Sequence, residues 1–163
     1  MLLGSTSNND TSPGTELLVL QLILQQRYAE VYQLLNKQQS PQASTLYNMA
    51  LCLHWSGNYQ GALNRLENIR LAQQVNGISQ LNTNSDYQEI RNRQNQTDDY
   101  LHGMSEAYIQ SFPVLVSDAI LRLKTDCWLQ LGNYAKVIAV ATPIAHKGYK
   151  NITEALKLAE TSK

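Results

Sequence analysis

A Gly-Asn-Tyr turn occurs twice in this chain, each time between two apolar stretches and five residues after a cysteine. The two copies read CLHWSGNYQGALNRL at residues 52–66 and CWLQLGNYAKVIAVA at residues 127–141. Glycine suits the end of a helix, where the backbone takes a positive φ, and asparagine caps the helix that follows. The repetition therefore predicts two helical hairpins that share one kind of turn, with no chemistry in the turn itself.

A third, weaker copy precedes them, QLILQQRYAEVYQLL at residues 21–35, in which Gln26 stands where the others have glycine. Around the middle turn, apolar residues recur at helical spacing on both sides. They are Leu46, Met49, Ala50 and Leu53 before the turn, and Ala62, Leu63, Leu66 and Ile69 after it. We therefore predict an all-α protein with three hairpins, at about 13–39, 42–72 and 114–146.

The remaining segments are assigned by their position between the hairpins. Residues 1–12 are predicted to be a flexible leader, and 13–163 a single domain. Because 75 residues separate the tyrosines of the second and third hairpins, against 31 for the first and second, residues 76–113 are predicted to form a helical insertion. Residues 151–162 are predicted to form a final helix that caps the open end of the hairpins.

The middle unit, ASTLYNMALCLHWSGNYQGALNRLENI at residues 43–69, resembles the tetratricopeptide repeat family, whose unit is an antiparallel pair of helices about 34 residues long. Its core and turn positions are filled by Leu46, Met49, Ala50, Leu53, Gly57, Tyr59, Ala62, Leu66 and Ile69. The resemblance implies a right-handed stack of about three hairpins, in which the first helix of each lines a groove that holds a peptide or a partner helix.

The resemblance also implies which residues face that groove. They are Tyr47, Leu51, His54 and Trp55 in the middle unit, and Arg122 and Asp126 in the third. An exposed tryptophan beside tyrosine and histidine is typical of a partner-binding surface. Bulky apolar residues are also common in cores, so Trp55 either faces the groove or packs against a neighbouring hairpin or the insertion.

The first helix is apolar on nearly every side, with the sequence ELLVLQLIL at residues 16–24. Such a helix is buried on more than one side. Either the insertion covers it or a second copy of the chain does, and in the second case a homodimer forms through Leu17, Leu20 and Leu24.

Charge and hydropathy exclude several classes of partner. Thirteen basic and thirteen acidic residues balance, so no net field recruits nucleic acid. The longest apolar run, LLVLQLIL, is far shorter than the ~20 residues that span a bilayer, which predicts no transmembrane helix. With no secretory signal recognisable at the N-terminus, a cytoplasmic location is expected.

No motif for catalysis, metal binding or a cofactor is found. His54, His102 and His146 lack the spacing of metal ligands, and Cys52 and Cys127 sit among apolar residues, where a thiol acts as a small hydrophobe. We therefore expect no metal, no cofactor and no enzymatic activity, but an adaptor or assembly subunit that binds a protein partner.

Two alternative functions stay open. One is a ligand-binding or enzymatic domain with the insertion as lid and His102, Glu106 and Arg122 as its polar groups, and the other is the helical part of a larger surface or secretion-related assembly.

Overall fold

The computed structural model describes residues 12–72 and 84–162, and the regular structure in these ranges is entirely helical. The α-helices are α1 Pro13–Leu24, α2 Tyr28–Leu35, α3 Ala43–Trp55, α4 Tyr59–Glu67, α5 Ser85–Gln94, α6 Glu106–Ser111, α7 Pro113–Gln130, α8 Tyr134–Ala141 and α9 Lys150–Thr161. Two 3₁₀ helices, η1 Asp99–Leu101 and η2 Thr142–Lys147, complete the set for these ranges. The all-α prediction is confirmed, whereas most of the predicted leader and the first part of the insertion lie outside the described residues.

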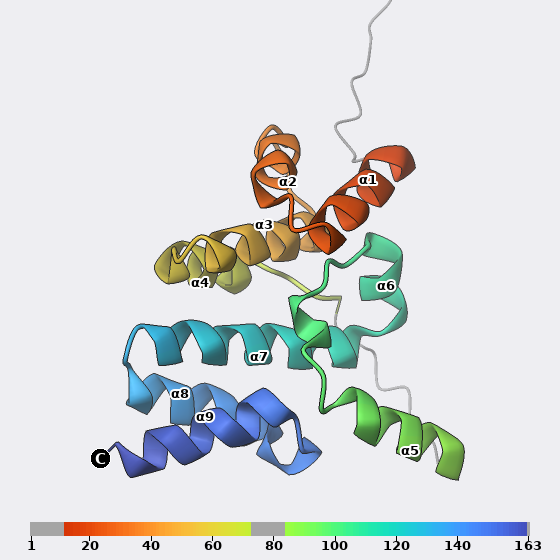
Figure 1. Ribbon diagram of the computed structural model, residues 1–163. Coiled ribbons are helices and arrows are strands. Elements are labelled where there is room, and N and C mark those ends of the chain that lie inside the picture. Colours follow the sequence, from red (N-terminus) through yellow and green to blue (C-terminus); the bar gives the residue numbers. More distant parts are fainter. Residues whose placement is uncertain (1–11, 73–83, 163) are drawn as a thin grey trace, which may run out of the picture.

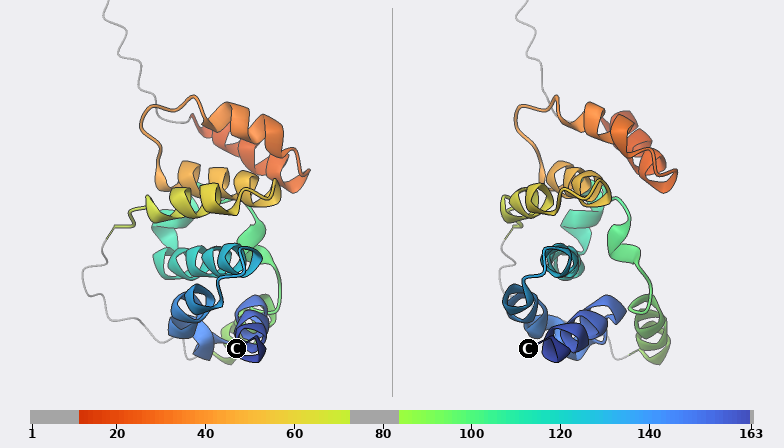
Figure 2. Two further views of the ribbon diagram at one scale, coloured as in Figure 1. Left: turned by 90° about the vertical axis from the view of Figure 1, so that its left-hand side faces the viewer. Right: turned by 60° about the vertical axis from the view of Figure 1, so that its left-hand side comes forward.

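Three pairs of helices follow one another down the molecule: α1 with α2, α3 with α4, and α7 with α8 (Figure 1). Each pair contacts the next, since α2 packs on α3 and α4 packs on α7. The last helix, α9, packs against both α8 and α7 at the C-terminal end (Figure 2). The segment that links α4 to α7 contains α5, η1 and α6, and it returns to the body where η1 meets α7 and α6 meets α3.

The three hairpin turns have the same hydrogen bonds. In the middle turn, Asn58 N–H donates to the carbonyl of Leu53 at 2.8 Å and Gly57 N–H to that of His54 at 3.0 Å. Gly57 has a φ of 83°, and the Asn58 side chain accepts from the N–H of Gly61 at 2.9 Å. This is the glycine-terminated helix end followed by an asparagine cap that the sequence predicts.

The other two turns follow this pattern with different residues. Gly132 has a φ of 71°, and Asn133 caps α8 by accepting from the N–H of Lys136 at 3.1 Å. In the first turn Gln26 itself takes the positive φ, 57°, although a side chain at this position makes that conformation unfavourable. The recurring Gly-Asn-Tyr is therefore a structural turn, and the geometry persists even where glycine is missing.

The starts of two helices outside the hairpins use different partners. The first residue of α5 is Ser85, and the preceding Asn84 caps the helix by accepting from the N–H of Tyr87 at 3.1 Å. In α9, Asn151 is the second residue, and its side chain bonds to Arg122 and Asp126 on α7. The side chain of Asn151 is therefore used for a tertiary contact rather than for its own helix.

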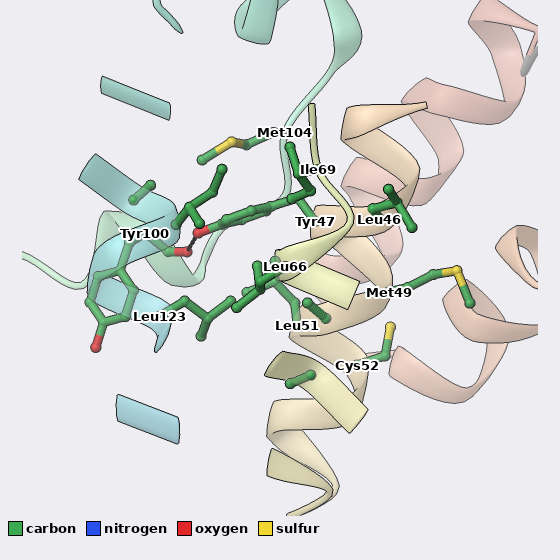
Figure 3. Close-up of a cluster of buried hydrophobic side chains, with 14 of the residues drawn as sticks. Leu46, Tyr47, Met49, Leu51, Cys52, Leu66, Ile69, Tyr100, Met104 and Leu123 are labelled. Atoms are coloured by element: carbon green, nitrogen blue, oxygen red, sulfur yellow. Dashed lines mark hydrogen bonds between the residues drawn. The ribbon is translucent and has the colours of Figure 1, made fainter. Parts of the chain in front are cut away.

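The insertion contributes to the main hydrophobic core. The largest cluster of buried apolar side chains joins residues of all three hairpins to three from the insertion (Figure 3). Those three are Tyr100, Met104 and Ile109. Because they are buried among residues of α3 and α7, the insertion is part of the folded body in the range that the structure describes.

Candidate functional site

Two of the predicted groove residues lie inside the protein. Tyr47 has no exposed surface and Leu51 is 2% exposed, both in the core that α3 shares with α4 and the insertion. The Tyr47 hydroxyl donates a hydrogen bond to the backbone carbonyl of Tyr100, drawn as the dashed line in Figure 3. The face of α3 that was predicted to bind a partner is thus covered here by the chain's own insertion.

A neighbouring asparagine on α3 fastens the insertion more tightly. Asn48 Nδ2 donates to the carbonyl of Met104 at 2.9 Å, and the N–H of Met104 donates to Asn48 Oδ1 at 2.9 Å. The Asn48 side-chain amide therefore pairs with both backbone groups of Met104, in the way that two opposite residues pair across antiparallel β-strands. Sequence reasoning missed Asn48, which lies beside two other buried polar residues of α3, Ser44 and Thr45.

The insertion also passes close beneath α1. A Cβ added to Gly103 would lie 2.7 Å from Ile23 Cδ1 and 2.9 Å from Leu20 Cδ2, so these two side chains of α1 lie directly against the insertion. The N–H of Glu106 donates to Glu16 Oε1 at 2.6 Å. The insertion therefore covers one side of the apolar first helix, as one of the two predicted arrangements requires.

Part of α1 nevertheless stays uncovered. Leu17 is 58% exposed and Leu24 is 70% exposed, whereas Leu20 is half-buried beside the insertion. The face predicted for homodimerisation is thus divided between covered and uncovered residues, and the homodimer stays a prediction.

Arg122 on α7 is the centre of a buried polar network. Its side chain is 2% exposed, and its guanidinium donates to Asn151 Oδ1 at 2.8 Å, to Asp99 Oδ1 at 2.6 Å and to the Thr97 carbonyl at 2.8 Å. The rings of Tyr100 and Tyr149 lie on it, with centroids 4.2 and 4.5 Å from Cζ. These partners compensate for burying the charge, and they join α7 to both the insertion and α9.

Asp126, one turn beyond Arg122, does not pair with it directly. Its carboxylate accepts from the Tyr100 hydroxyl and, at 3.1 Å, from Asn151 Nδ2. Burial raises the pKa of Asp126, while these two hydrogen bonds oppose the rise. Asn151 and Tyr100 therefore link Asp126 to Arg122, since both residues contact both side chains.

A second ionic contact supports the same region. Lys147 Nζ lies 2.8 Å from Asp118 Oδ2, and the Tyr149 hydroxyl donates to the same carboxylate at 2.6 Å. Tyr149 thus packs its ring on Arg122 while its hydroxyl is fixed by α7. These contacts attach the segment before α9 to α7.

His54 and Trp55 lie at the end of α3 and differ in exposure. Trp55 is 61% exposed, and its ring stacks on that of Tyr28 with centroids 5.0 Å apart. His54 is half-buried and meets the ring of Tyr59 edge-on at 5.5 Å. Burial lowers the pKa of His54, and the nearby Asp126 charge opposes this shift.

A surface hollow of about 360 Å³ lies beside Trp55, between the start of α2 and the end of α3. Its lining consists of Tyr28, Ala29, Tyr32, Cys52, Leu53, Trp55 and Ser56. None of these side chains is charged, and the hydroxyl of Ser56 already donates to the carbonyl of Leu53 at 2.9 Å. Among the residues of the hollow, only Trp55 was predicted from the sequence to bind a partner. The hollow forms between α2 and α3, and the sequence does not indicate how these two helices meet.

The polar groups of the lid alternative do not converge. His102 is exposed, Arg122 is buried in its own network, and the Glu106 carboxylate accepts from the N–H of Ser44 at 3.1 Å at the start of α3. In the described ranges, no hydrogen bond or ion pair joins any two of the three.

Both cysteines are buried, and burial raises the pKa of the Cys52 thiol and of the Cys127 thiol to about 12. At pH 8 about one thiol in ten thousand is then the reactive thiolate, against about one in four for an exposed cysteine.

We expect a disulfide reagent such as DTNB to modify the native protein about a thousandfold more slowly than the urea-unfolded chain at pH 8. Single Cys→Ala variants assign the two rates, and a fast Cys52 would contradict its burial beneath the hollow.

Within the described ranges, no group of three or more histidine, cysteine or carboxylate side chains is arranged to hold a metal ion. None of the helices there is both long enough and apolar enough to cross a membrane. No protein-family model, curated protein or solved structure matches this chain.

Proposed function

We propose that this chain is a tetratricopeptide-like, non-enzymatic module that binds a protein partner through the hollow beside Trp55. The partner presents uncharged, bulky apolar side chains on a short segment. The observation that carries the proposal is the 61% exposure of Trp55 at the edge of an uncharged hollow, because tryptophan beside an apolar pocket is enriched at sites that bind proteins.

Two properties of the hollow favour this occupant. Its walls are aromatic and aliphatic and carry no charged group. An apolar segment can therefore cover them without removing water from an ion. The stack of Trp55 on Tyr28 already orders both rings, which lowers the entropy lost on binding. A small polar ligand would need several convergent polar groups for orientation, and the hollow offers few.

The position of the insertion also supports binding at this place. It occupies the inner face of α3 and α7, where the family resemblance placed the groove, and buries Tyr47 and Leu51 there. Of the six predicted groove residues, Trp55 keeps the most accessible surface. Binding is therefore proposed at the edge of the first two hairpins rather than along the inner face.

Peptides selected from a random displayed library on the wild-type protein provide the test. We expect the selected peptides to carry spaced Leu, Phe or Trp residues, and Trp55→Ala to weaken their binding at least about tenfold. In a Trp128→Phe protein, Trp55 is the remaining tryptophan, and its emission should shift to the blue when such a peptide covers it.

Leu158→Ala is the matched control, since it removes an exposed apolar side chain from α9, far from the hollow in the chain. Both substitutions are expected to change the free energy of unfolding by less than about 1 kcal/mol, because the side chains are more than half exposed. Selected peptides that bind Trp55→Ala as well as wild type, or that leave the Trp55 emission unchanged, would place binding elsewhere.

A further inference from the structure

A small polar cavity lies beneath the insertion and shares no lining residue with the hollow beside Trp55. It has a volume of about 30 Å³ and lies between α5, η1, α6 and α7. Its lining consists of Arg91, Asp99, Tyr100, Met104, Tyr108, Leu115, Ala119, Arg122 and Tyr149. The charged residues among these are two arginines and one aspartate, so the walls carry an excess of one positive charge.

Arg91 supplies this excess charge. On α5, only Arg91 and Gln94 are partly buried, and Arg91 lines the cavity. The Asp99 carboxylate is already taken by Arg122 at 2.6 Å and by Gln94 at 3.1 Å. Arg91 therefore has no acidic partner among the described residues. Its charge acts on Tyr108, because burial raises the pKa of the Tyr108 hydroxyl and Arg91 reduces that rise.

Arg122 offers unused donors at the same cavity. A guanidinium carries five N–H groups, and three of those of Arg122 are bonded, to Asn151, Asp99 and Thr97. Two N–H groups remain without a partner in the part of the chain that the structure describes. The Tyr100 and Tyr149 hydroxyls donate elsewhere, to Asp126 and Asp118, so they do not compete for these donors.

We propose that this cavity binds a carboxylate, held between the guanidinium of Arg91 and the unused N–H groups of Arg122. A cavity needs about 10–15 Å³ for each water-sized group, so 30 Å³ has room for about two such groups. A carboxylate directs two oxygens and one negative charge at its donors, which matches this small volume and the single excess positive charge of the walls. The site is separate from the hollow at Trp55 and does not depend on the function proposed there.

The proposal is tested by titrating the ¹⁵N-labelled full chain with acetate at constant ionic strength, with acetamide as the neutral probe of the same shape. We expect saturable shifts at the Nε–H signals of Arg91 and Arg122 with acetate and none with acetamide. Arg91→Gln should weaken acetate binding at least about tenfold, whereas Arg93→Gln, on the exposed side of α5, should bind as wild type does.

A second titration separates the two sources of a carboxylate. A blocked peptide, acetyl-Gly-Glu-Gly-amide, that binds more tightly than acetate indicates an acidic side chain of a partner protein, and weaker binding indicates a small free acid. Shifts that grow linearly with acetate, or equal affinity in Arg91→Gln and Arg93→Gln, overturn the proposal. Melting curves of both variants confirm that each is folded.

Discussion

Replacing Arg122 by methionine is expected to lower the free energy of unfolding by about 3 kcal/mol or more. The substitution keeps an unbranched apolar stem but removes the donors to Asn151, Asp99 and the Thr97 carbonyl. The Asp99 carboxylate then loses its cation while it is only partly exposed, and Asn151 Oδ1 is left unpaired in the interior. Urea denaturation followed by far-UV circular dichroism measures the change.

Two further variants make this result specific to the network. Arg93→Met removes the same charge from an exposed position and should change stability by less than about 0.5 kcal/mol. Arg122→Lys should recover little of the loss, because one ammonium cannot reach three separated acceptors or stack between two rings as a planar guanidinium does. A lysine variant as stable as wild type would show that charge alone, rather than this geometry, holds the insertion.

Replacing Tyr47 by alanine is expected to cost about 3–5 kcal/mol, the range for deleting a large buried ring. The ring is fully buried between α3, α4 and the insertion, and its hydroxyl bonds to the Tyr100 carbonyl. Tyr47→Phe isolates the hydroxyl, and the unpaired carbonyl that it leaves should cost about 1–3 kcal/mol. Hydrogen exchange at the Met104 amide should accelerate in both variants, because the same segment loses an anchor.

This prediction separates a core role for Tyr47 from the groove role that the family resemblance implied. A residue that only contacts a partner can be replaced by alanine without a large change in the stability of the free protein. Tyr87→Ala, at an exposed tyrosine on α5, is the control and should change stability by less than about 1 kcal/mol. If Tyr47→Ala were as mild as this control, the inner face would be open and the burial of Tyr47 would be wrong.

The helical hairpins could be predicted from the sequence because their signals are local. Gly57 and Gly132 at positive φ, with Asn58 and Asn133 as caps, act on backbone groups within five residues along the chain. Such interactions form wherever the surrounding sequence is helical, whatever the rest of the protein does. The same locality explains how the Gln26 turn was identified without its glycine.

The surroundings of the predicted site residues could not be predicted from the sequence where their partners are distant in the chain. Tyr47 bonds to a residue 53 positions away, and Asn48 to one 56 positions away. Arg122 and Asn151, which share a hydrogen bond, are 29 residues apart. The family resemblance placed Tyr47 on the groove face of its helix, but it contained no information about what covers that face in this chain.

The sequence by itself therefore determined the all-α class and the three hairpin turns, and it left two arrangements open for Trp55. Only the tertiary structure decided that the insertion covers the inner face, that Arg122 is buried between two tyrosine rings, and that an apolar hollow opens beside Trp55. The physical reason is the range of the interactions. Helix ends are fixed by hydrogen bonds between near neighbours, whereas the insertion is placed by side chains that meet only after the chain has folded.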